Sequence, residues 1–170
     1  MILAIDPGVN GALAWGTVDK FTAWRAMPRG LNGLRAVLAV VDNYMPQQGR
    51  IVVEDVGMAF GPGVSAQSAY RFARHRGILE AMLYATFPHL NIEWVKPQTW
   101  QRVIIPKPPQ TLKSRVLNGK EKRDTKALAH AYTTQNYFDF GVDKQCADAV
   151  CIWAYARQHH NPSKPTNTEV

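Results

Sequence analysis

The first residues of the chain, MILAIDPG, combine an apolar run with a carboxylate at its end. Residues 2–5 are apolar and Pro7-Gly8 is a turn signal, so Ile2–Asp6 is predicted to be a buried central strand. A carboxylate at the end of such a strand is costly to bury without a partner. The identity of the partner of Asp6 therefore constrains both the fold and the function of this chain.

The order of the remaining elements predicts one α/β domain. Three strands come first, and helices then alternate with two further strands. The predicted strands are residues 2–6, 11–17, 20–27, 51–56 and 91–95, and the predicted helices are residues 31–44, 65–86, 97–104, 123–134 and 144–159. Antiparallel strands followed by parallel crossovers make a five-stranded mixed sheet with helices on both faces.

Local signals mark the ends of these elements. Ser65 is expected to cap the long helix 65–86, Pro97 lies near the start of helix 97–104, and Asp124 or Thr125 caps the next helix. The segment 105–122 is predicted to be an irregular basic loop. We expect the domain to span residues 1–158, with 159–170 as a flexible polar tail.

Composition limits the cellular compartments and the cysteine chemistry expected for this protein. No apolar run approaches the roughly 20 residues of a membrane span, and the N-terminus lacks the pattern of a signal peptide, so we expect a cytoplasmic protein. Cys146 and Cys151 lie five apart in one apolar segment, where a helix points them in different directions. They are interpreted as reduced core residues rather than a disulfide or part of a zinc site.

The positive charge is concentrated in one segment. Of 20 Lys and Arg and 13 Asp and Glu, nine basic and two acidic residues lie between Lys96 and Lys126, which leaves eleven of each sign elsewhere. A basic block in an otherwise balanced chain is typical of a protein that binds a polyanion such as DNA, and a solvated basic loop is the other interpretation. The candidate DNA contacts in this segment are Arg102, Lys107, Lys113, Arg115, Lys120, Lys122 and Arg123.

Three acids are placed among apolar residues. Asp6 ends the first strand, Glu54 lies in the fourth strand (IVVEDV), and Asp148 lies in the apolar last helix (KQCADAVCIWAYAR). The first and fourth strands are expected to be neighbours because a helix connects them as a crossover. The three carboxylates are therefore predicted to converge at one edge of the sheet.

Each acid also has a purely structural interpretation. Asp6 can accept hydrogen bonds from the following turn, Glu54 can pair with an arginine, and Asp148 can be satisfied by backbone donors. Taken together, however, close carboxylates repel one another unless a proton or a cation lies between them. A hard divalent cation such as Mg²⁺ prefers oxygen ligands and leaves positions open for water and phosphate oxygens, so we expect Asp6 to be metal-bound.

A metal-held carboxylate cluster beside a basic segment favours phosphodiester hydrolysis. In two-metal sites the ions lie about 3.5 to 4 Å apart and stabilise the attacking and leaving oxygens. The five histidines are scattered, at positions 75, 89, 130, 159 and 160, and no Ser-His or Cys-His arrangement stands out as a nucleophile. The sequence therefore predicts a nuclease that uses no covalent intermediate.

The chain resembles the RuvC family of Holliday junction resolvases, which belong to the RNase H-like nucleases. The resemblance covers roughly residues 2–157 and is carried by an ordered set of motifs: ILAIDPGVNGALAW, IVVEDV, SAYRFARHRGILEAML, VKPQTWQRVI, DTKALA and ADAVCIWAYA. It implies a homodimer that cuts two strands of a four-way DNA junction symmetrically, with Mg²⁺ or Mn²⁺ as the cofactor and about two ions per active site.

The resemblance also assigns roles to individual residues. Asp6, Glu54 and Asp148 match the metal-binding acids of the family, and Lys126 matches a lysine that approaches the scissile phosphate. The segment SAYRFARHRGILEAML matches the helix of the dimer interface, although its apolar positions equally suit an intramolecular core. These apolar positions are Ala69, Phe72, Ile78, Leu79, Met82 and Leu83.

The sequence departs from the family pattern at two places. The family has a further acid three residues before its last aspartate, where this chain has Gln145; Asp143 lies nearby and is first interpreted as the N-cap of the last helix. Gln145 and Asp143 therefore remain candidate fourth ligands. The family also places an aromatic wedge after the strand glutamate, where this chain has Gly57, and Phe60 is the candidate replacement.

Two other functions remain open at this point, and a third is disfavoured. A nuclease of the same fold can cut forks or flaps instead of four-way junctions, and a catalytically inactive module can bind junctions through the basic segment alone. Sugar-kinase and actin-like ATPases also carry an early Asp-x-Gly turn, but they need a second nucleotide-binding lobe for which this chain is too short.

Overall fold

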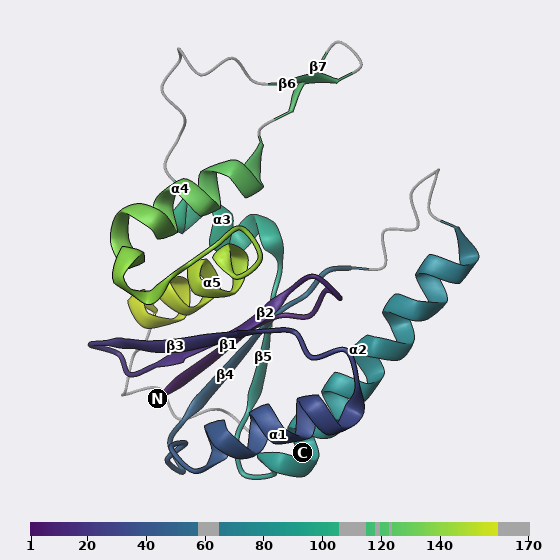
Figure 1. The fold of residues 1–170 in the computed structure, drawn as a ribbon, viewed down its shortest axis with the longest axis vertical. Coiled ribbons are helices and arrows are strands. Elements are labelled where there is room, and N and C mark those ends of the chain that lie inside the picture. Colours follow the sequence, from purple (N-terminus) through teal and green to yellow (C-terminus); the bar gives the residue numbers. More distant parts are fainter. Residues whose placement is uncertain (58–64, 106–114, 118–119, 123, 160–170) are drawn as a thin grey trace.

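A five-stranded mixed sheet forms the centre of the computed structural model, which describes residues 1–57, 65–105, 115–117, 120–122 and 124–159 (Figure 1). The sheet has the strand order β3-β2-β1-β4-β5. Its strands are β1 (Ile2–Asp6), β2 (Ala12–Gly16), β3 (Phe21–Ala26), β4 (Arg50–Glu54) and β5 (Ile92–Val95). β1 pairs with β2 in antiparallel and with β4 in parallel orientation, as predicted.

Helices cover both faces of this sheet. One face carries α3 (Pro97–Ile104), α4 (Thr125–Tyr137) and α5 (Ala147–Gln158), and the other carries α1 (Leu31–Asp42) and α2 (Ala66–Thr86) (Figure 1). A short 3-10 helix, η1 (Phe138–Phe140), follows α4. The fold class is therefore the predicted α/β architecture, a five-stranded mixed sheet with helices on both faces.

Strand alternation divides the core into two clusters. Ile2, Ala4 and Val52 pack with α5, whereas Leu3, Ile5 and Val53 pack with α1 and α2. Successive residues of a strand point to opposite faces, so positions two apart share a face. This parity decides which acids at the strand ends can meet.

The expected helix ends are confirmed at several places. The Ser65 side chain accepts a hydrogen bond from the backbone N–H of Ser68, Asp124 caps α4 through Ala127, and Pro97 occupies the first turn of α3. Cys146 and Cys151 are buried and free. Among the described residues, no helix is both long and apolar enough to cross a bilayer.

Two details of the prediction were wrong. The last helix begins at Ala147 with Cys146 as its N-cap, so Asp143 is not the cap of this helix. Its Oδ1 instead accepts hydrogen bonds from the backbone N–H groups of Gln145 and Cys146, at 2.8 and 3.1 Å, and this local turn delays the start of the helix.

The basic segment also contains regular structure. β6 (Arg115–Leu117) and β7 (Lys120–Lys122) form a two-stranded antiparallel sheet in which Arg115 pairs with Lys122. The prediction of an irregular loop was therefore wrong at these six positions. The Asn-Gly sequence between these two segments is a sequence signal that favours a hairpin.

Candidate active site

Asp6 and Glu54 end two neighbouring parallel strands on the same face of the sheet. Ala4 is paired in register with Val52, and each acid lies two residues further along its strand. Because side chains two apart in a strand share a face, both carboxylates point to the side that α5 covers. The expected meeting of the first and fourth strands thus brings these two acids together.

Asp148 reaches the same place from the helix. It lies in the first turn of α5, and its neighbours Ala147 and Cys151 belong to the buried cluster that includes Ala4 and Val52. The N-terminal end of a helix carries partial positive charge, which favours a carboxylate there. The helix thus delivers the third acid to the sheet edge where β1 and β4 end.

The pKa shifts indicate that the three carboxylates are electrostatically coupled. Burial is the largest cause in each case: it raises the pKa of Asp6, that of Glu54 to about 7 and that of Asp148 to about 6. The negative charge of Asp6 raises the pKa of the other two acids further. Removing these carboxylates from water while they repel one another is unfavourable, which is the situation that a bound cation relieves.

Lys126 is the positive charge that opposes this repulsion. It lies in the first turn of α4 and is exposed to solvent. Its positive charge partly offsets the rise in pKa of all three carboxylates. The structure therefore brings together the four residues that the sequence predicted as catalytic, although they are spread between positions 6 and 148.

Each strand acid has one oxygen engaged by the protein. Asp6 Oδ1 accepts a hydrogen bond from the backbone N–H of Gly8 at 3.1 Å. Gly11 makes room for the same side chain, because a Cβ atom there would lie 2.8 Å from Asp6 Cγ. Asp6 thus accepts a hydrogen bond from the following turn, as its purely structural interpretation expects. That hydrogen bond occupies only one of its two carboxylate oxygens.

Glu54 has a different partner from the arginine considered for it. Its Oε1 accepts a hydrogen bond from the indole Nε1 of Trp100 at 2.9 Å. An arginine pairs instead with Asp55, the next residue. Arg76 Nη2 lies 3.0 Å from Asp55 Oδ1. The Asp148 carboxylate accepts no hydrogen bond from the part of the chain that the structure describes, so the alternative interpretation, in which backbone donors satisfy this acid, is not supported there.

The donor set fits divalent ions that share their coordination with water. Within the described residues, no three His, Cys, Asp or Glu side chains are arranged to hold one ion, and the expected binding of about two ions by these carboxylates stays a prediction. Mg²⁺ is usually bound through one or two carboxylates plus waters and substrate phosphates. Paired carboxylates with one oxygen engaged match that mode of binding.

The two candidate fourth ligands lie in the turn before α5. Gln145 is exposed, and its side-chain amide reaches to 3.5 Å from the carbonyl oxygen of Gly11, in the loop that follows β1. Asp143 is exposed and uses Oδ1 for its own turn. Their roles as ligands stay predictions.

The predicted DNA contacts are described only in part. Arg102 is exposed on α3. Arg115, Lys120 and Lys122 belong to β6 and β7, whose strand pairing is described but whose side chains are not. The other predicted DNA contacts lie outside the described residues: Phe60, Lys107, Lys113 and Arg123.

Sequence reasoning missed Trp100 as a member of the site. A buried tryptophan usually finds an acceptor for its N–H, and Trp100 is fully buried in α3, which follows β5 directly beside β4. The residue type therefore predicts that the Trp100 N–H has an acceptor. The identity of that acceptor, Glu54, depends on the packing of α3 against α5.

The fold is similar to that of two solved structures. A structure of Thermus thermophilus RuvC superimposes with a TM-score of 0.57 at 14% sequence identity, over 92% of this chain and 95% of that one. The chain has a RuvC-like fold. A second structure, T. thermophilus RuvC in complex with a Holliday junction substrate, gives a TM-score of 0.56 at 16% identity, covering 93% and 95% of the two chains. No family model and no curated protein matches the sequence.

Proposed function

We propose that this protein is a metal-dependent, structure-selective DNA endonuclease that resolves four-way (Holliday) junctions by hydrolysing phosphodiester bonds. The observation that carries the proposal is the convergence of Asp6 and Glu54 on one face of the sheet with Asp148 and Lys126. The RuvC-like fold supports it, since the similar structures span nearly the whole chain and one of them is bound to a Holliday junction.

The three acids are proposed to hold two Mg²⁺ or Mn²⁺ ions through their oxygens. When bound, these ions supply an activated water and stabilise the charge on the leaving oxygen. The carboxylates bind and orient the ions, and the backbone N–H of Gly8 and the indole of Trp100 orient the carboxylates. Lys126 is proposed to approach the phosphate and offset its negative charge, because it is exposed beside the acids.

DNA is the proposed substrate class because the basic residues gather in one segment, and the junction is proposed from the similarity to a structure bound to a Holliday junction. Nine of the 20 Lys and Arg residues lie between Lys96 and Lys126, which includes α3, the β6-β7 hairpin and the start of α4. This segment ends at Lys126, which lies near the acids. Phosphate contacts supply most of the affinity for DNA, and they need no sequence recognition.

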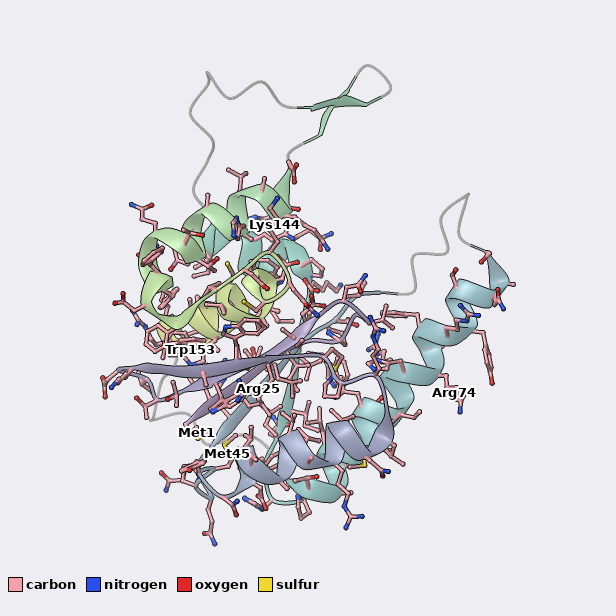
Figure 2. All side chains as sticks on the ribbon, viewed as in Figure 1. Met1, Arg25, Met45, Arg74, Lys144 and Trp153 are labelled. Atoms are coloured by element: carbon pink, nitrogen blue, oxygen red, sulfur yellow. The ribbon has the colours of Figure 1, made fainter. Side chains whose placement is uncertain are left out.

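A homodimer would place two such sites on one junction. α2 is the proposed interface, because between Ala66 and Thr86 only Leu79 and Leu83 are fully buried, while Tyr70 in the N-terminal half is 66% exposed. Ile78, Leu79, Met82 and Leu83 serve the intramolecular core, so the interface would use the N-terminal half of the helix, which extends beyond the sheet and includes Arg74 (Figure 2).

The test is a cleavage panel of four-way junction, fork, flap and linear duplex, each with Mg²⁺. The proposal predicts symmetric nicks in the junction. Asp6→Asn is expected to abolish cleavage while junction binding persists, because the DNA contacts come from the basic segment. Cleavage of linear duplex alone would refute junction resolution, cleavage of forks or flaps in preference to junctions would establish the broader branched-DNA nuclease, and binding without cleavage would identify an inactive binding module.

A further inference from the structure

The indole of Trp100 makes a direct polar contact with the Glu54 carboxylate. Nε1 of Trp100 donates a hydrogen bond to Oε1 of Glu54 at 2.9 Å. Trp100 has no exposed surface, and Glu54 is 7% exposed. A hydrogen bond to a charged acceptor in such a poorly solvated place is stronger and more directional than one at the surface.

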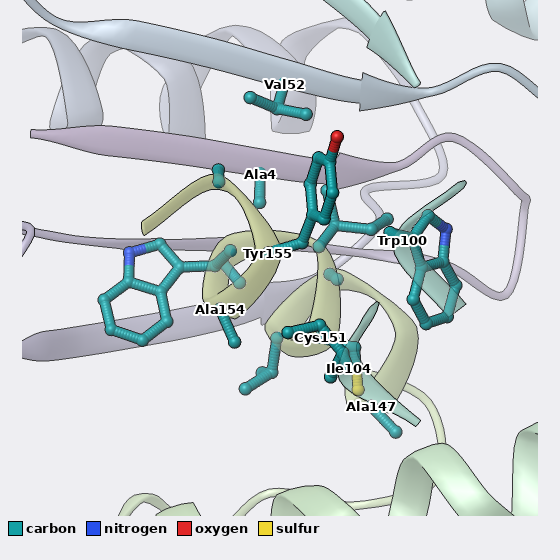
Figure 3. Packing of buried hydrophobic residues seen from close by; sticks show 14 of the residues in the cluster. Ala4, Val52, Trp100, Ile104, Ala147, Cys151, Ala154 and Tyr155 are labelled. Carbon is teal, nitrogen blue, oxygen red and sulfur yellow. The ribbon is translucent and has the colours of Figure 1, made fainter. Parts of the chain in front are cut away.

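The donor in this contact is held firmly by its surroundings. Trp100 lies on α3, one turn before Ile104, and both side chains pack into the cluster that contains Ala147 and Cys151 of α5 (Figure 3). A ring enclosed in a close-packed cluster has few conformations open to it. The position of the N–H group is thus set by the core and not by the site.

We propose that Trp100 is a positioning residue for Glu54, occupying Oε1 so that the carboxylate is held in one orientation and Oε2 stays available to a divalent ion. This inference rests on the proposed metal-dependent function. Oε2 accepts no hydrogen bond from the part of the chain that the structure describes, as expected if Oε1 binds the indole and Oε2 binds the ion.

The neighbouring charge explains why Glu54 needs such a restraint. The Asp6 carboxylate repels that of Glu54, and a glutamate side chain has three rotatable bonds by which it can turn away from that repulsion. A fixed donor on Oε1 opposes that movement. Partners that orient metal ligands in this way are typically worth about 10 to 100-fold in metal affinity or activity.

The chain offers a matched control for simple packing. Trp153 belongs to the same buried cluster and also has no exposed surface (Figure 2 shows its place), but its Nε1 is the one buried side-chain polar atom in the described residues without a hydrogen-bond partner. Trp100→Phe and Trp153→Phe thus remove the same atoms from the same cluster. Only the first removes a contact to Glu54.

The experiment measures Mn²⁺ binding to the DNA-free protein by electron paramagnetic resonance. Trp100→Phe is expected to weaken Mn²⁺ binding about tenfold, and Trp153→Phe to leave it within about twofold of the parent value. A second variant replaces Trp100 with benzothienylalanine, which keeps the ring shape and lacks the N–H, so it tests the hydrogen bond even where Trp100→Phe does not fold. It is expected to weaken binding as Trp100→Phe does.

Glu54→Gln separates this inference from the proposed function. If Trp100 acts through Glu54, Trp100→Phe is expected to have no further effect on Mn²⁺ binding in the Glu54→Gln protein. Equal Mn²⁺ affinity of the parent and the benzothienylalanine variant would overturn the positioning role while leaving the metal site intact. Unchanged Mn²⁺ binding in Glu54→Gln itself would instead overturn the assignment of Glu54 as a ligand, and with it the proposed function.

Discussion

Asp55 is ion-paired with Arg76 at 3.0 Å, whereas Glu54, the residue before it, faces the other side of the sheet and contacts Trp100. Two adjacent acids in one sequence motif therefore have different surroundings. The ion pair connects Asp55 to α2, which contains Arg76. The guanidinium carbon of Arg76 also lies 4.5 Å from the centre of the Trp94 ring. Strand alternation separates the structural acid from the proposed metal ligand.

These two acids give a matched pair of substitutions. Glu54→Gln is expected to lower the single-turnover rate of junction cleavage by at least about 100-fold, because it removes a negative ligand. Asp55→Asn is expected to change that rate by less than about threefold and to lower the free energy of unfolding by about 1 kcal/mol or less, since its ion pair is partly exposed. Similar losses of cleavage in both variants would contradict the assignment.

The stability of the metal-free protein should depend on pH in an unusual direction. Glu54 and Asp148 have folded-state pKa values of about 7 and about 6, above their ordinary values of 4.5 and 3.8, so the folded state binds their protons more tightly than the unfolded state. Their contribution is fully present below about pH 4 and is lost as the pH rises through 6 and 7. Between pH 5 and 8, the free energy of unfolding in EDTA is expected to fall by on the order of 2 kcal/mol.

Urea denaturation at several pH values measures this dependence. The Glu54→Gln/Asp148→Asn double variant is the control, because it removes both titrating groups, and its stability should vary less over the same range. A parent protein that becomes more stable between pH 5 and 8 would show that these carboxylates are not held in the repulsive arrangement described.

Lys126 should affect catalysis and metal binding in opposite directions. Lys126→Gln is expected to lower junction cleavage by about 100-fold, because a charge beside the phosphate is lost. It is also expected to tighten Mn²⁺ binding to the DNA-free protein, because Lys126 no longer offsets the carboxylate charges. Lys144→Gln, an exposed lysine before α5, is the control and should leave both unchanged. Weaker Mn²⁺ binding in Lys126→Gln would argue against this role.

The basic segment should determine the salt dependence of DNA binding. Each phosphate contact contributes about 0.9 to the slope of log affinity against log salt concentration, so neutralising Lys120, Lys122 and Arg123 together is expected to lower the slope by up to about 2.7. A triple substitution of exposed basic residues elsewhere, Lys20, Arg29 and Arg35, is the control. An unchanged slope in the first variant and a lower one in the second would move the DNA-binding face away from the segment.

Much of the site was predictable because it depends on strand order and parity. The apolar runs before Asp6 and Glu54 identified two strands, and the helix between them implied that these strands are parallel neighbours, which the register confirms. The position of Asp148 followed from the apolar circumference of its helix, which packs on the sheet. These are local signals, each readable from a few residues.

The remaining features depend on contacts between distant segments. The hydrogen bond from Trp100 to Glu54 joins residues 46 apart and requires the packing of α3 on α5, which no local pattern reports. The start of α5 shifted because the Asp143 side chain holds a competing turn with the next backbone amides. The pairing of β6 with β7 was predictable from a local signal, because the Asn-Gly sequence between the two strands favours a hairpin.

A crystal structure of the protein with bound Mn²⁺, in which anomalous scattering locates the ions, would test the proposed metal site. Anomalous peaks are expected within coordination distance of oxygens from Asp6, Glu54 and Asp148, with water completing each coordination shell. Glu54 Oε2 is expected to be a ligand, while Oε1 keeps its hydrogen bond to Trp100. Strong peaks at other residues, with none at these three carboxylates, would show that the acids do not form the metal site.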